Sequence, residues 1–89
     1  MSEIREVLAT KKAEKQIKSL PPHIKKKIDE LIDHLKDDPL PAKRYDLKKI
    51  RGKKDVYRIR IGNYRVLYKI QDNVIIILLM IQRKQAYRL

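Results

Sequence analysis

The chain has 89 residues, no cysteine and a formal net charge of +12. This length suffices for one small domain, so we expect residues 1–89 to form a single domain, and the lack of cysteine excludes a disulfide framework and a thiolate metal site. The longest apolar run, residues 74–81, is too short to span a bilayer and no signal peptide precedes it, so we expect a cytoplasmic protein without a membrane partner.

The first half of the chain predicts one short strand and two helices. Residues 4–9 are suited to a strand, and Thr10 can cap the helix that follows. Apolar side chains at helical spacing predict helices over residues 11–20 and 22–37, and Pro22 is well placed to begin the second. Each helix has a single apolar stripe, so the pair predicts a helical hairpin that covers a sheet.

The second half predicts strands. Residues 56–68 alternate in side-chain character on both sides of Gly62-Asn63, a pattern typical of a β-hairpin with a two-residue turn. A second turn at Asp72-Asn73 leads into the apolar run of residues 74–81, which is typical of a buried central strand. The elements run β-α-α-β-β-β, with residues 47–50 as a further short strand, and predict an α+β fold.

The hairpin has two different faces. Closing the turn at Gly62-Asn63 places Arg60 opposite Arg65 and leaves Arg58 beside them, with no carboxylate in the hairpin between them. Like charges across a strand pair repel by roughly 0.2–1 kcal/mol, whereas the planar guanidinium group matches phosphate well. We therefore predict a phosphate-backbone site, and the alternative is a solvated basic face.

The positive charge belongs to the second half. Residues 1–39 have nine Lys and Arg against eight Asp and Glu, whereas residues 40–89 have fourteen against three. Such a surface favours nucleic acid, an anionic membrane or an acidic protein. The basic half is predicted as strands rather than as an amphipathic helix, which favours nucleic acid. We assign binding of nucleic-acid phosphates to Lys53, Lys54, Arg58 and Arg60.

The last strand predicts a second surface. If Asp72-Asn73 closes a two-residue turn, strict alternation directs every other residue from Ile75 to Ile81 into the core. The remaining apolar row then lies beside the arginines and consists of Val74, Ile76, Leu78 and Met80. An apolar row outside the core marks a partner site, so we expect a protein to bind there. The alternative is that the eight C-terminal residues fold back over the row.

The chain resembles the RelE/ParE superfamily of toxin–antitoxin toxins. The resemblance is carried by the order of elements, by LKKIRGKKDVYRIRIGNYRVLYKI at residues 47–70, and by the apolar strand followed by Arg-Lys-Gln-Ala-Tyr at residues 83–87. It implies a small twisted antiparallel sheet with a helical hairpin packed on one face. RelE-like members are mRNA interferases that cut mRNA in the ribosomal A site and are neutralised by a cognate antitoxin. ParE-like members share the fold and poison DNA gyrase.

The family motif also assigns residues. Arg58 and Arg60 match two basic positions on the first strand of the hairpin, and Arg65 matches the arginine after the turn. Arg83 and Tyr87 match the late arginine and tyrosine of the RelE pattern, which favours the nuclease branch. Many relatives have a histidine where this chain has Gln82, so no imidazole is expected to act there.

RNA can be cut without a metal when its own 2′-hydroxyl attacks the adjacent phosphate. Arginines stabilise the charge of the resulting phosphorane. Tyrosine ordinarily has a pKa near ~10, and a cluster of cations lowers that pKa. We assign Tyr87 as general base, Arg65 to the scissile phosphate and Arg83 to the phosphate or the leaving oxygen, and we expect no metal or other cofactor.

Three functions remain open. The favoured one is a ribosome-dependent endoribonuclease toxin whose partners are the ribosome, mRNA and a cognate antitoxin. The alternatives are a ParE-like toxin that inhibits gyrase and a non-catalytic basic domain that binds RNA or the ribosome. The antitoxin is expected to use an acidic or amphipathic segment that covers both the arginines and the apolar row.

Overall fold

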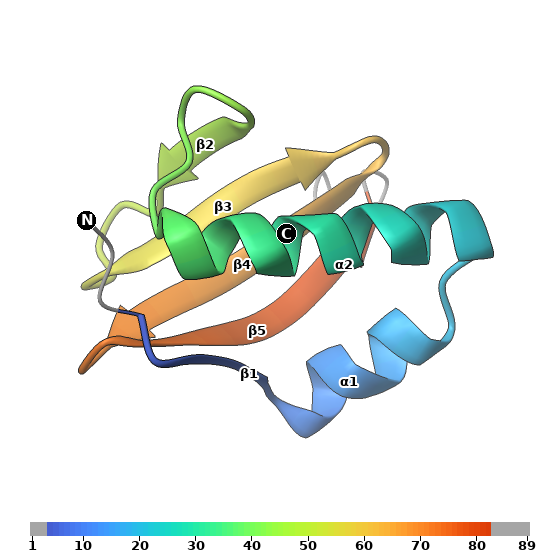
Figure 1. Cartoon of the computed structure of the whole chain (residues 1–89), viewed down its shortest axis with the longest axis horizontal. Helices are drawn as coiled ribbons and strands as arrows, with labels where there is room; N and C mark the ends of the chain where they lie inside the picture. Colours follow the sequence, from blue (N-terminus) through green and yellow to red (C-terminus); the bar gives the residue numbers. More distant parts are fainter. Residues whose placement is uncertain (1–3, 83–89) are drawn as a thin grey trace.

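The computed structural model describes residues 4–82 and shows two helices on one face of a five-stranded sheet (Figure 1). This arrangement confirms the predicted α+β class and the order of the elements. They are β1 (Glu6–Ala9), α1 (Lys11–Lys18), α2 (Pro22–Asp37), β2 (Asp46–Lys49), β3 (Val56–Ile61), β4 (Tyr64–Gln71) and β5 (Val74–Gln82). Within the described residues, no helix is both long and apolar enough to cross a membrane.

The sheet is mixed rather than wholly antiparallel. Its strand order is β1-β5-β4-β3-β2, and β2 to β5 pair as antiparallel neighbours. Strand β1, however, lies parallel to β5 at the edge. No tight turn fixes the direction of β1, because the two helices carry the chain from this edge to β2 at the opposite edge.

Local sequence signals determine where the helices begin. Thr10 caps α1 through its side-chain oxygen, which accepts a 3.1 Å hydrogen bond from the backbone N–H of Ala13. The same hydroxyl donates to the carbonyl of Leu78 at 2.7 Å and so ties the cap to β5. Pro22 is the first residue of α2, where its missing N–H leaves no bond unmade.

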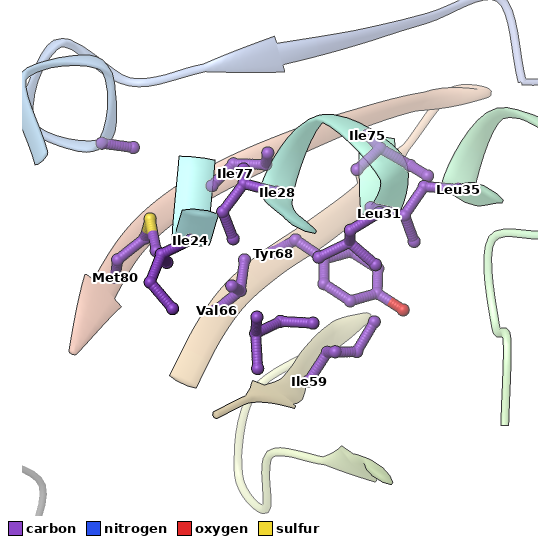
Figure 2. Packing of buried hydrophobic residues seen from close by; sticks show 12 residues of the cluster. Ile24, Ile28, Leu31, Leu35, Ile59, Val66, Tyr68, Ile75, Ile77 and Met80 are labelled. Atoms are coloured by element: carbon purple, nitrogen blue, oxygen red, sulfur yellow. The ribbon is translucent and has the colours of Figure 1, made fainter. Parts of the chain in front are cut away.

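The core lies between α2 and the sheet. Figure 2 shows the apolar stripe of α2 facing side chains from β3, β4 and β5. The helix contributes Ile24, Ile28, Leu31 and Leu35, and the strands contribute Ile59, Val66, Tyr68, Ile75, Ile77 and Met80. The Tyr68 hydroxyl, on a fully buried side chain, donates to the carbonyl of Pro39 at 2.7 Å. Alternate residues of the strands therefore face away from the helices.

Strand β5 departs from strict alternation. Leu67 of β4 pairs with Leu79, but the next residue, Tyr68, pairs with Ile77, so Leu78 is an extra residue at a β-bulge. The extra residue reverses the alternation beyond it. Met80 consequently lies in the core with 3% of its surface exposed. The prediction that Met80 belongs to the apolar row beside the arginines was therefore wrong.

Candidate phosphate-binding site

The hairpin has the register predicted from its sequence. Arg60 is the direct partner of Arg65, and Arg58 is the partner of Leu67. Gly62 has a φ of 57° and Asn63 has no positive φ, which is the pattern of a type II′ turn with glycine in its first central position. The three arginines therefore share the sheet face that points away from the helices.

The basic face has a carboxylate from a neighbouring strand. Asp46 of β2 pairs with Arg60 of β3 in the backbone register. Its Oδ1 lies 3.5 Å from Nη2 of Arg58 and its Oδ2 lies 3.8 Å from Nε of Arg60. Sequence reasoning missed Asp46 because it considered acids within the hairpin alone. Asp46 and Lys48 lie two residues apart and therefore on the same face of β2, which pairs with β3. This spacing is the signal that could have placed Asp46 beside the arginines.

The arginines differ in exposure. The Arg60 side chain is 49% exposed, whereas that of Arg58 is 13% exposed. The buried Nε of Arg58 has no hydrogen-bond partner among residues 4–82. Arg65 is half-buried. A small cavity of about 20 Å³ at the turn is lined by Arg60, Gly62, Asn63 and Arg65. The turn thus places two guanidinium groups beside one concavity.

The two lysines assigned to phosphate binding lie elsewhere. Lys53 and Lys54 are exposed in the turn between β2 and β3, before the start of β3. At about 3.3 Å per residue, Val56 lies roughly 7 Å of strand from Arg58 and roughly 13 Å from Arg60. The lysines therefore lie before β3, toward the end of the hairpin opposite Gly62, and their assignment to phosphate binding stays a prediction.

The apolar row is rearranged by the bulge. Val74 and Ile76 lie on the arginine side, as predicted, and both are half-buried. Leu78 is the bulge residue and is also half-buried. Leu79 and Ile81 replace Met80 on this side, because they pair with Leu67 and Arg65. Leu8 of β1 lies next to Ile76 and is 46% exposed. The row that the structure forms therefore differs from the predicted one and consists of Leu8, Val74, Ile76, Leu79 and Ile81. From here on, the apolar row means this set.

The three tyrosines of the hairpin lie on its core side. Tyr57 and Tyr64 pack against the core cluster that contains Tyr68. Burial raises the pKa of Tyr68 well above its ordinary value, and burial followed by the charge of Glu30 raises the pKa of Tyr45. Both shifts disfavour the phenolate that a general base requires. Neither tyrosine is suited to proton abstraction near neutral pH.

The remaining assigned residues, Arg83 and Tyr87, lie outside the described residues. Ile81, two positions before Arg83, is on the arginine side of the sheet. Across residues 4–82, no three His, Cys, Asp or Glu side chains gather as a group that could hold a metal ion. The arrangement offers guanidinium donors for an anion on one face of the hairpin.

Known proteins share this sequence and fold. A model of the family described as the ParE toxin of the type II toxin–antitoxin system parDE matches residues 7–87. A protein designated RelE1 from Methanocaldococcus jannaschii is 42% identical over 80 residues, which cover 88% of this chain and 89% of that protein. A chain in the archaeal RelE–RelB complex from Pyrococcus horikoshii OT3 superposes with a TM-score of 0.82 at 34% identity, covering 90% of this chain and 96% of that one. The RelB–RelE antitoxin–toxin complex from Methanococcus jannaschii gives a TM-score of 0.79 at 34% identity over 90% of this chain and 94% of that one.

Proposed function

The chain belongs to the RelE/ParE superfamily and is a toxin of the RelBE type of toxin–antitoxin system, and from this premise we propose that it is a ribosome-dependent endoribonuclease that cuts mRNA in the A site. The observation that carries the proposal is the convergence of Arg58, Arg60 and Arg65 on one sheet face. A rigid hairpin fixes their positions before RNA arrives. Fixed donors stabilise developing negative charge without reorganisation.

The proposed step is attack of the RNA 2′-hydroxyl on the adjacent phosphate. The 2′-oxygen bonds to phosphorus, the bond to the 5′-oxygen breaks, and the products are a 2′,3′-cyclic phosphate and a 5′-hydroxyl. Arg65, beside the concavity at the turn, contacts the scissile phosphate, and Arg58 and Arg60 hold its neighbours. Tyr87 accepts the 2′-hydroxyl proton, Arg83 supports the phosphate or the leaving oxygen, and the leaving 5′-oxygen takes up a proton from solvent water to become the 5′-hydroxyl. Tyr45 and Tyr68 are poor alternatives to Tyr87 because their pKa values are raised.

The proposed protein partner is a cognate antitoxin. Two structural relatives come from complexes between RelE and RelB. In this chain the arginines adjoin the apolar row, with Arg65 directly opposite Ile81. An antitoxin segment with both acidic and apolar side chains would match this surface and exclude RNA from it. Lys53 and Lys54 are left to bind a more distant RNA phosphate.

Gyrase inhibition is the second candidate. It is favoured by the family model that matches residues 7–87, whose description names the ParE toxin. A ParE-like toxin would stop DNA supercoiling by gyrase and leave mRNA intact. The identity of 42% to RelE1 favours the nuclease instead.

The test is a cell-free translation reaction in which mRNA 5′ ends are mapped by primer extension, with and without ribosomes. We compare the wild type with Arg65→Gln and Tyr87→Phe. Arg5→Gln removes an exposed arginine near β1 and serves as the matched control. We expect cuts within translated codons that require ribosomes, persist in the control and fall by roughly 100-fold in each site variant, the loss typical of one catalytic group. Intact mRNA together with blocked supercoiling would reject the nuclease in favour of gyrase, and no effect in either assay would leave a non-catalytic binding domain.

A further inference from the structure

We propose that Asp46 is an internal counter-ion of the arginine site. Its carboxylate occupies the position in which an RNA phosphate binds, and so it weakens RNA binding by the free toxin. The inference rests on the proposed function, because it assumes that Arg58 and Arg60 bind the RNA backbone. It adds a residue to the site that tunes affinity. Asp46 is not assigned a part in bond cleavage.

The position of the carboxylate imitates that of a phosphate. Each oxygen of Asp46 faces a different arginine, Oδ1 at 3.5 Å from Arg58 and Oδ2 at 3.8 Å from Arg60. A phosphodiester has two non-bridging oxygens that can bridge the same two guanidinium groups. A phosphate in that position would repel the carboxylate, so the two anions compete for the same donors.

The carboxylate is held weakly. Both distances exceed the 2.7–2.9 Å or so of a charge-assisted hydrogen bond. The Asp46 side chain is 46% exposed, and ion pairs this accessible to water contribute little to stability. Asp46 therefore neutralises the arginines through long ion pairs, and an incoming phosphate can replace it.

The fold does not need this carboxylate to hold β2 in place. Backbone pairing from Asp46–Arg60 to Lys49–Tyr57 joins β2 to β3 whatever the side chain. The other two acids of residues 40–89, Asp55 and Asp72, lie in turns at the end of the hairpin away from Gly62. Of these three acids, Asp46 is therefore the one that the fold places beside the arginines.

The test measures binding of a fluorescently labelled single-stranded RNA by anisotropy at several salt concentrations. The RNA has 2′-O-methyl groups so that it cannot be cleaved. The variants are Asp46→Asn, Asp46→Glu and Arg60→Gln. Asp72→Asn makes the same charge change in the β4–β5 turn and is the matched control.

We expect Asp46→Asn to bind RNA roughly threefold to tenfold more tightly than the wild type, from the loss of two long ion pairs made by a half-exposed carboxylate. The slope of log K against log salt should steepen by roughly 0.7 for each additional phosphate that the variant neutralises. Asp46→Glu should bind as the wild type does. Asp72→Asn should change affinity less than twofold, because screening attenuates distant charges.

The inference is overturned if Asp46→Asn binds no more tightly than Asp72→Asn. Weaker binding, or a variant that does not fold by circular dichroism, would make Asp46 a structural support and would likewise overturn it. Failure of the proposed function gives a different result. If Asp46→Asn binds RNA more tightly, this increase in affinity depends on Arg60, and the protein cuts no mRNA on ribosomes, the counter-ion role is supported and the nuclease is rejected. If the protein cuts mRNA on ribosomes and Asp46→Asn binds RNA as the wild type does, the nuclease is supported and the counter-ion role is rejected.

Discussion

Gln16 of α1 takes the place of a neighbouring strand for the second half of β5. Its Nε2 donates to the carbonyl of Met80 and its Oε1 accepts from the N–H of Met80, both at 2.8 Å. Strand β1 ends at Ala9, opposite Ile77. The side-chain amide therefore satisfies the edge of β5 where β1 no longer does.

Replacing Gln16 with Met tests this role. Methionine has a similar length and helix propensity but makes neither hydrogen bond. Each bond contributes about 0.5–1.5 kcal/mol net, so we expect the free energy of unfolding to fall by about 1–3 kcal/mol. For a domain of 60–100 residues, a loss of about 2 kcal/mol lowers Tm by about 8–16 °C.

The measurement is urea and thermal unfolding followed by circular dichroism. Lys12→Met introduces the same residue at an exposed position of α1 and is the control. If Gln16→Met and Lys12→Met have the same unfolding midpoint as the wild type, water satisfies the backbone of Met80 equally well and Gln16 does not stabilise the edge of β5. A changed m value would instead show that the substitution altered the compactness of one state.

Two further perturbations test the core and the apolar row. Tyr68→Phe removes the donor to the Pro39 carbonyl and should cost about 1 kcal/mol. Burial raises the pKa of Tyr68 above its ordinary 10.0, so the unfolded chain ionises first and wild-type stability should fall above that pH by up to about 1.4 kcal/mol per pH unit. Urea unfolding on both sides of pH 10.0 should show a shallower decline for Tyr68→Phe, and equal declines would contradict the assignment. Leu8→Asp, at a position that is 46% exposed on the arginine side, should weaken antitoxin binding at least roughly tenfold by calorimetry, since a charge is buried without a partner. Leu40→Asp, at a position 42% exposed in the loop after α2, should bind as the wild type does, and equal losses in both variants would remove the apolar row from the interface.

The sequence alone was sufficient for the parts of the fold that depend on neighbours in the chain. Period-two alternation around Gly62-Asn63 determined the register of β3 and β4, and with it the shared face of Arg58, Arg60 and Arg65. Thr10 and Pro22 marked the helix starts correctly. These signals are local because a turn or a cap involves only a few consecutive residues.

Three features depended on how the strands pack and pair. Strand β1 pairs with β5 from the other end of the chain. The bulge at Leu78 and the approach of Asp46 to the arginines lie between strands that follow one another, but no turn or cap residue marks them in the sequence. An uninterrupted apolar strand such as β5 has no polar residue to mark the bulge, so alternation alone placed Met80 on the wrong face. The tertiary structure decided which side of β5 meets α2, because only the packed sheet requires Ile77 and Met80 to face the same core.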